Sequence, residues 1–212
     1  MRLYALAAAR TVDVAGRVTD DGVVVGERVF GIADGADFGL GSGQAALAEV
    51  TRLLGRRPRL RHLGPALHAA YFALWYHDAG ERRLVANVTI AVWSGTRVAI
   101  GHVGDARAYL VRGGTVQILT TDHAQTQCDD DGVPRLGRSQ ASPQPEIRVV
   151  RVGDGDRLVL CTDGLWRNVT EADLAAVTNQ SAASACEALC RTASRGDEDA
   201  TVVVVVFSEG RA

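Results

Sequence analysis

The sequence predicts an α+β fold, with antiparallel β-sheets packed face to face and helices on the outside. Most of the chain consists of runs with the two-residue period or the continuous apolar character of strands. Segments with helical spacing fall into two groups, and they do not alternate with single strands as βαβ units would. The chain has 212 residues, 47% of them hydrophobic, which suffices for one sizeable core. We therefore expect a single domain over residues 1–212.

The first part of the chain should contain strands, then two helices, then strands again. We expect a strand at 3–9, followed by a strand pair that turns at Gly26-Glu27 and ends at Asp34. Helical spacing of apolar residues predicts helices at 44–54 and 63–76. The strand period then returns, and turns at Ser94-Gly95 and Gly113-Gly114 suggest a meander. Its predicted strands are 84–93, 97–103, 106–112 and 116–120.

The second part begins with a polar segment, 122–145, which we interpret as a long loop. Strands are expected at 147–152 and 157–162. Thr170 precedes acidic residues and should cap a short helix, and Ser181 or Ser184 should open another that ends near 192. The last strand, 201–207, is apolar throughout, so it should lie in the middle of a sheet.

Composition excludes several classes of protein. The chain has 23 basic and 25 acidic residues and a net charge of −2, which argues against a nucleic-acid-binding module. The arginine-rich stretch 52–61 is interpreted as a solvated helix end and linker. No apolar run approaches the roughly 20 residues of a membrane span, and the short apolar start is interpreted as a strand rather than a signal peptide. The four cysteines lack zinc spacing and are expected to be free thiols of a cytoplasmic protein.

Acidic residues stand at strand ends or in glycine turns along the whole chain. Gly31-Ile32-Ala33-Asp34-Gly35 and the segment 158–164 share one arrangement, an apolar strand that ends in Asp-Gly. Such ends can place carboxylates side by side at the rim of a core, and glycine lets backbone approach what they hold. For any single acid the alternative is an ordinary turn. The acids at such positions are Asp20, Asp21, Asp34, Asp105, Asp163, Asp197, Glu198 and Asp199.

If these carboxylates meet, cations must neutralise them, because like charges about 4 Å apart repel by several kcal/mol in a semi-buried site. Carboxylate, carbonyl and water oxygens suit Mg²⁺ or Mn²⁺ rather than zinc. Two such ions bridged by one carboxylate can hold a hydroxide that attacks a phosphoryl group in line. Spacing alone leaves open whether the acids converge. His102 and His123 are expected to be structural residues rather than ligands.

Six segments follow, in order, the motifs of one known family. They are Thr19-Asp20-Asp21-Gly22, Ile32-Ala33-Asp34-Gly35, Val103-Gly104-Asp105-Ala106-Arg107-Ala108-Tyr109, Leu119-Thr120-Thr121-Asp122-His123, the stretch 155–165 and Glu198-Asp199-Ala200-Thr201-Val202. With these motifs the chain resembles the PPM (PP2C-type) family of metal-dependent protein serine/threonine phosphatases, in its compact bacterial form. The resemblance runs over nearly the whole length.

The resemblance implies a central antiparallel β-sandwich with helix pairs on both outer faces and two Mn²⁺ or Mg²⁺ ions at one end. It implies that Asp34 bridges both ions, that Asp21 and the Gly35 carbonyl bind one ion, and that Asp163 and Glu198 bind the other. Asp20, in the same acidic element as Asp21, and Asp105, the usual ligand of a third metal, complete the implied metal set. Arg17 corresponds to the family arginine that grips the substrate phosphate, a role that suits a planar guanidinium.

Four departures from the family pattern bear on activity. Glu198 stands where the family has aspartate, although Asp197 or Asp199 could substitute after a register shift. Arg167 stands where the family often has a third-metal aspartate, so we expect two metals at most, and Arg167 could pair with Asp105. The segment 36–39 lacks the histidine proposed as general acid for the leaving alcohol. The flap, at about 123–145, is abbreviated.

Two hypotheses for function follow. In the first, the chain is a signalling phosphatase that hydrolyses phosphoserine or phosphothreonine on proteins, the products of a serine/threonine kinase, by a metal-bridged water. It would act as a monomer, without nucleic acid or membrane. In the second, the chain is a pseudophosphatase with the same fold and weak metal binding, acting as a regulatory binding module. The features that favour the second are Glu198, Arg167 and the missing histidine.

Overall fold

Two five-stranded sheets, antiparallel throughout, form the centre of the computed structural model, which describes residues 2–13, 19–35, 41–76, 85–123, 136, 144–194, 196 and 198–210. The first sheet has the order β1-β10-β9-β6-β7, and the second has the order β2-β3-β4-β5-β8. The strands are β1 (Arg2–Val12), β2 (Gly22–Val25), β3 (Val29–Gly35), β4 (Ala86–Ser94), β5 (Arg97–Val103), β6 (Arg107–Arg112), β7 (Thr115–Ile118), β8 (Glu146–Arg151), β9 (Arg157–Cys161) and β10 (Ala200–Gly210).

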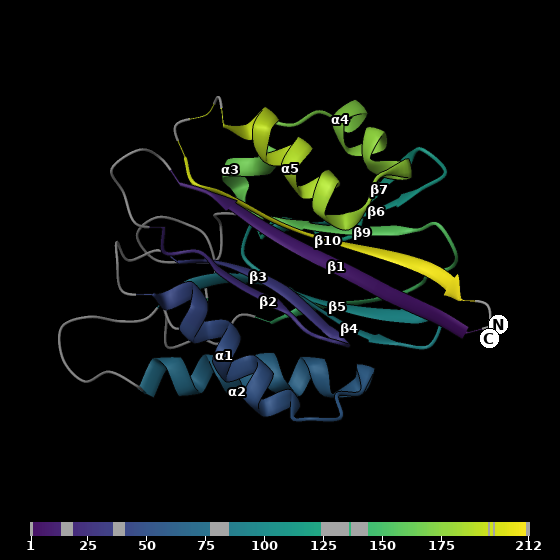
Figure 1. Ribbon diagram of the computed structural model, residues 1–212. Coiled ribbons are helices and arrows are strands. Elements are labelled where there is room, and N and C mark those ends of the chain that lie inside the picture. Colours follow the sequence, from purple (N-terminus) through teal and green to yellow (C-terminus); the bar gives the residue numbers. More distant parts are fainter. Residues whose placement is uncertain are drawn as a thin grey trace.

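Helices cover the outer face of each sheet, which gives a four-layer α-β-β-α arrangement (Figure 1). The pair α1 and α2 packs on the second sheet, and α3, α4 and α5 pack on the first. The helical segments are α1 (Ser42–Leu54), η1 (Leu60–His62), α2 (Leu63–Tyr76), α3 (Asp163–Trp166), α4 (Glu171–Ala176), η3 (Val177–Asn179) and α5 (Ala182–Ala193). The predicted α+β sandwich with helices on both outer faces is confirmed.

Three apolar layers hold these elements together. One lies between α1, α2 and the second sheet, one between the two sheets, and one between the first sheet and the helices above it. Strand β10 contributes to two of them, because Val203 and Val205 face the other sheet while Val202 and Val204 face the helices. It lies between β1 and β9, so the prediction of a central final strand is confirmed.

The predicted meander is wrong at one point. Strands β4 and β5 form a hairpin, and so do β6 and β7, but β5 pairs with β8 while β6 pairs with β9 in the other sheet. The chain crosses between the sheets at Gly104, whose φ of 111° lies in the region that favours glycine. Because β4, β5 and β6 are buried on both faces, their residues carry little alternation from which a sheet could be assigned.

Both predicted helix starts in the second half are confirmed. Thr170 caps α4 through a capping box with Asp173, and the Ser181 side chain accepts a hydrogen bond from the Ser184 backbone N–H at the start of α5. Cys186 and Cys190 lie on the buried face of α5 as free thiols. Within the described residues, each helix is too short or too polar to cross a bilayer. Most of the predicted flap, 124–135 and 137–143, lies outside the described residues.

Candidate metal centre

One end of the sandwich gathers acidic residues from distant parts of the chain. Asp21 precedes β2, Asp34 lies near the end of β3, Asp163 begins α3 directly after β9, and Asp199 precedes β10. The pairing of Val12 with Ala200 and of Val202 with Cys161 brings the end of β1, the end of β9 and the start of β10 together. The pKa of Asp21 is raised to about 8, first by burial and then by the nearby carboxylates of Asp34, Asp199 and Asp163, against a lowering by Thr201. These acids therefore share one electrostatic environment.

Thr201 holds the Asp21 carboxylate in place. Its hydroxyl donates a short hydrogen bond to Asp21 Oδ2, and its Oγ1 lies 3.0 Å from Thr11 Oγ1 on β1. The Thr201 backbone N–H donates to Thr162 Oγ1 at 2.9 Å, next to Asp163. Thr201 thus links the element that carries Asp21 to the one that carries Asp163, a role that the sequence motif alone did not suggest.

Asn87 links two further acids. It lies opposite Asp34 in the β3–β4 pair and is fully buried. Its Nδ2 donates to Asp34 Oδ2 at 3.1 Å and to Asp105 Oδ1 at 2.7 Å. Sequence reasoning missed Asn87, although a lone amide in the largely apolar run Ala86–Val92 was a usable signal.

Asp105 is also held from the other side. The Trp166 indole N–H donates to the Asp105 carbonyl oxygen at 2.9 Å, and the Arg107 guanidinium lies 3.5 Å from the centre of the Trp166 ring. Arg107 in turn makes a two-pronged contact with Asp122, with Nε–Oδ1 at 2.9 Å and Nη2–Oδ2 at 2.7 Å. This stack fixes the Gly104-Asp105 turn against α3.

Arg167 neutralises part of the acidic cluster. Its Nη1 lies 3.2 Å from Asp163 Oδ2 and 2.9 Å from Glu198 Oε2. Burial lowers the pKa of Arg167, but these two carboxylates and that of Asp105 raise it, and the net result lies above the ordinary value. Arg167 therefore forms ion pairs with Asp163 and Glu198. Asp105, the other partner that the sequence suggested, acts on Arg167 through its charge.

Glu198 and Asp199 have different surroundings. The Glu198 side chain is 52% exposed and is paired with Arg167, while the Asp199 carboxylate acts on Asp21. The assignment of Glu198 as a metal ligand stays a prediction, and this geometry favours the alternative, Asp199.

Asp20 forms hydrogen bonds with Ser42, the first residue of α1. Its Oδ1 accepts from the Ser42 backbone N–H at 3.0 Å and its Oδ2 from the Ser42 hydroxyl at 2.5 Å, where a negative charge complements the helix N-terminus. Its carboxylate also packs against the Cα of Gly35, where a Cβ would overlap it. Both oxygens of Asp20 thus accept hydrogen bonds from Ser42, and its part in metal binding stays a prediction. Arg17 and the segment 36–40 lie outside the described residues.

Gly164 sets the distance between α3 and the start of β10. A Cβ at this position would overlap the Asp199 carbonyl oxygen and touch the Glu198 side chain. We expect Gly164→Ala to destabilise the protein by about 1–3 kcal/mol, as overpacking does, and to move Asp163 relative to Asp199. Denaturant unfolding measures the first effect, and Gly153→Ala, where a Cβ meets open space, is the matched control. Equal stability of the two variants would contradict this close approach.

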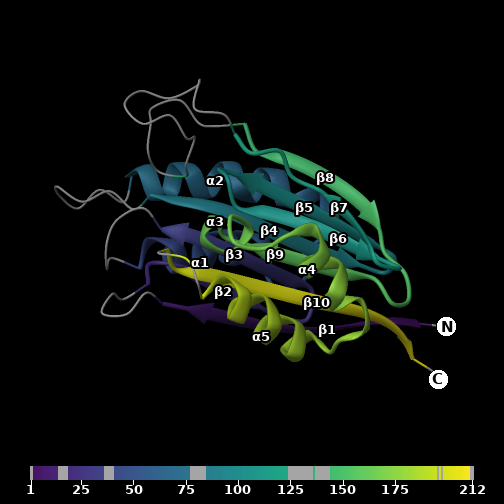
Figure 2. The same ribbon diagram turned by 90° about the horizontal axis from the view of Figure 1, so that it is seen from above.

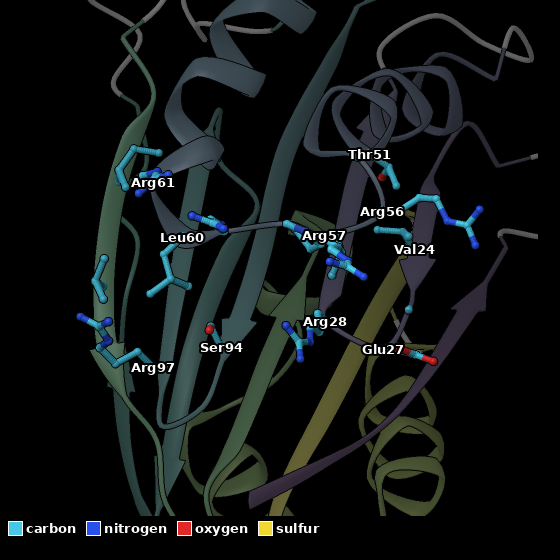
Figure 3. A pocket seen from close by; sticks show the side chains of 17 residues that line it. Val24, Glu27, Arg28, Thr51, Arg56, Arg57, Leu60, Arg61, Ser94 and Arg97 are labelled. Carbon is cyan, nitrogen blue, oxygen red and sulfur yellow. The ribbon is translucent and has the colours of Figure 1, made fainter.

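A separate pocket of about 1240 Å³ lies at the other end of the strands (Figure 3). Arg28 directly precedes β3 and Arg97 begins β5, whereas Asp34 and Asp105 stand at the far ends of these strands. Its lining includes Glu27 and the exposed arginines Arg28, Arg56, Arg57, Arg59, Arg61 and Arg97. This cavity is therefore distinct from the acidic cluster and has the opposite charge.

The acidic cluster fits hard divalent cations. Its donors are carboxylate oxygens, which suit Mn²⁺ and Mg²⁺. Burial is the main cause of the raised Asp21 pKa, and the negative charges of Asp34, Asp199 and Asp163 add to it, so bound cations would offset that repulsion. In this respect the residues fit a metal centre.

Comparison with known proteins agrees with this geometry. The sequence model of the family described as "Protein phosphatase 2C" matches residues 73–199. The serine/threonine protein phosphatase PstP of Mycobacterium tuberculosis is 28% identical over 212 residues, which cover 88% of this chain and 41% of the relative. A probable protein phosphatase 2C 45 of Oryza sativa subsp. japonica is 25% identical, with 90% of this chain and 80% of the relative covered. The chain thus spans about two fifths of the length of PstP.

Solved structures show the same architecture. The catalytic domain of PstP in complex with two manganese ions superposes with a TM-score of 0.84 and 26% sequence identity, covering 98% of this chain and 100% of that domain. The six motifs, the two-sheet sandwich and the gathered acids are thus accounted for together. The chain belongs to the protein phosphatase 2C family.

Proposed function

We propose that the chain is a Mn²⁺- or Mg²⁺-dependent protein serine/threonine phosphatase that acts on phosphorylated proteins. The observation that carries the proposal is the convergence of Asp21, Asp34, Asp163 and Asp199, whose mutual repulsion contributes to the raised pKa of Asp21. Serine/threonine phosphatases among its relatives support the substrate class.

In this proposal Asp34 is the central ligand, with Asp21 and the Gly35 carbonyl on one side and Asp163 and Asp199 on the other. Two ions held there would supply the nucleophilic water and neutralise the phosphoryl group.

Asn87 orients the Asp34 carboxylate, and Thr201 orients that of Asp21. Arg17 binds the phosphate oxygens of the substrate. Arg167 disfavours a third ion beside Asp105, because it places a positive charge near that carboxylate.

The test is hydrolysis of p-nitrophenyl phosphate and of a phosphothreonine peptide by metal-free protein, with and without added Mn²⁺. We expect activity only with the metal, and a larger rate on p-nitrophenyl phosphate, whose leaving group needs no proton from a general acid. Absence of activity with every divalent ion tried would contradict the proposal.

A second candidate, the pseudophosphatase, rests on Arg167. Its guanidinium already neutralises Asp163 at 3.2 Å, so a metal ion there must compete with a fixed cation. The Arg167→Ala variant discriminates between the two, because a large gain in Mn²⁺ affinity together with new activity would identify the natural chain as the pseudophosphatase.

The two adjacent acids before β10 should differ in their effect on metal binding. We expect Asp199→Asn to weaken Mn²⁺ binding by about 10-fold or more, as loss of a ligand or its support does, and Glu198→Gln to change it much less. The physical reason is that Asp199 acts on Asp21, whereas Glu198 is half-exposed and paired with Arg167. Calorimetric titration with Mn²⁺ measures both, and the reverse order of effects would assign the ligand to Glu198.

A further inference from the structure

Two histidines and a glutamate meet beside the Gly104 turn. His102 is the last residue but one of β5, His123 follows β7, and Glu146 begins β8. One ligand-capable atom of each lies within 4.8 Å of the other two, and the two imidazole rings stand edge to face with centroids 5.0 Å apart. The three residues lie far apart in the sequence, so the short spacings typical of metal ligands do not identify them as a group.

The imidazole of His102 presents an unused lone pair. Its Nδ1 lies 2.9 Å from Thr89 Oγ1, and the Thr89 hydroxyl donates its only proton to the Ala106 carbonyl oxygen at 3.0 Å. Nδ1 must therefore carry the imidazole proton and donate to Thr89, which leaves Nε2 as the lone-pair nitrogen. Among the described residues Nε2 has no partner within hydrogen-bond geometry although His102 is 0% exposed, while the Gly104 and Thr121 backbone groups act on the same imidazole. A buried polar atom without a partner requires an explanation, and a metal ion is one.

The remaining protonation equilibria agree with a ligand role. The pKa of His102 is lowered to about 4, first by burial and then by His123, against a raising by backbone hydrogen bonds with Gly104 and Thr121 and by Asp122, so this imidazole is neutral at physiological pH. A histidine that binds a metal through one nitrogen normally donates its other N–H to an oxygen, as His102 does to Thr89. Burial also lowers the pKa of His123, while the charge of Glu146 opposes this.

The other two side chains are held close by hydrogen bonds. The His123 backbone N–H donates to the Gly104 carbonyl oxygen at 2.8 Å, and its Nδ1 accepts only a long contact of 3.4 Å from the Gly104 N–H. Glu146 Oε2 accepts from the Thr121 N–H at 2.7 Å, and both His123 and Glu146 are half-buried. Ligands of a tetrahedral zinc ion lie about 3.4 Å apart, so a contraction of about 1.4 Å at most closes the site.

We propose that His102, His123 and Glu146 form a binding site for Zn²⁺, or a chemically similar first-row ion, separate from the carboxylate centre. Two imidazoles and one carboxylate favour zinc over the Mn²⁺ and Mg²⁺ that suit the acidic cluster, and a fourth position remains for water. Strands β7 and β8 are the edges of different sheets and run along the same side of the molecule (Figure 2). An ion here therefore joins β5 and β8 of the second sheet to the segment that follows β7, and steadies the turn before Asp105.

The test uses the full chain in which Asp34→Asn and Asp163→Asn are combined, so that metal binding at the acidic cluster does not contribute to the measured heat. We expect one Zn²⁺ per chain by calorimetric titration. Introducing His123→Gln or Glu146→Gln should weaken binding by about 10-fold or more, whereas His68→Gln on the exposed face of α2 should not change it. Co²⁺ in place of zinc should show visible absorption bands that change with His123→Gln.

A second arm uses the natural sequence with saturating Mg²⁺, which occupies the acidic cluster and avoids any folding defect of the double variant. Zn²⁺ should still bind and raise the unfolding temperature, and both effects should depend on His123 and Glu146. The proposal is overturned if zinc affinity is the same with and without these two substitutions, or if zinc binding disappears once the acidic cluster is removed or filled. Neither outcome depends on whether the chain is an active phosphatase.

Discussion

Asp34→Asn is expected to reduce the Mn²⁺-dependent hydrolysis of p-nitrophenyl phosphate by at least about 100-fold. Asp34 lies near the end of β3, its carboxylate acts on Asp21, and its Oδ2 accepts from Asn87 at 3.1 Å. An asparagine preserves the shape but removes the negative charge that would be shared by two cations. The initial rate at saturating Mn²⁺ measures the effect.

The controls for this loss separate metal binding from folding. Glu187→Gln removes an exposed carboxylate of α5 that pairs with Arg191 one helical turn away, and its activity should stay within about twofold of the natural chain. Asp34→Asn itself should retain a cooperative unfolding transition. An active Asp34→Asn variant would remove this residue from the proposed chemistry.

Asp21→Asn should have the second large effect, which is on the free energy of unfolding. The sign of this effect should depend on whether metal is present. In the metal-free protein the pKa of Asp21 is raised from its ordinary 3.8 to about 8, first by burial and then by the neighbouring acids. Between these values the folded chain binds more protons than the unfolded chain, so the free energy of unfolding should fall as pH rises, by up to about 1.4 kcal/mol per pH unit from this group. Asp21→Asn removes this slope.

Without metal at pH 8, Asp21→Asn should therefore be more stable than the natural chain by an amount on the order of a few kcal/mol, less the weakened contact to Thr201. At about pH 4 the difference should vanish, and added Mn²⁺ should reverse the order because only the natural chain gains ligand stabilisation. Urea unfolding at both pH values, each with and without Mn²⁺, measures these four cases. A natural chain whose metal-free stability rises toward pH 8 would contradict the raised pKa.

Much of the fold could be predicted because its elements carry strong local signals. Helix α2 was predicted at its observed bounds, and β10 was recognised as central from its unbroken valine run. The assignment of strands to sheets could not be predicted in the same way. Gly104 turns the chain from one sheet into the other, and no local pattern distinguishes such a crossing from a hairpin.

The acidic site was predictable in part for a similar reason. Asp34 and Asp163 stand at the ends of apolar strands, so their position at a rim follows from the pattern. The roles of Asp20 and Asp199 depend on which way a side chain points after a turn, and adjacent acids are indistinguishable in sequence. Asn87 and Thr201 act through contacts that span the chain, which spacing does not reveal.

Titration of the metal-free chain with Mn²⁺ in a calorimeter tests most directly whether the gathered acids form a metal centre. The account predicts two bound ions for the natural chain, and fewer or much weaker ones after Asp21→Asn, Asp34→Asn or Asp163→Asn. A folded natural chain that binds no manganese at millimolar concentration, or that binds it equally after all three substitutions, would contradict it.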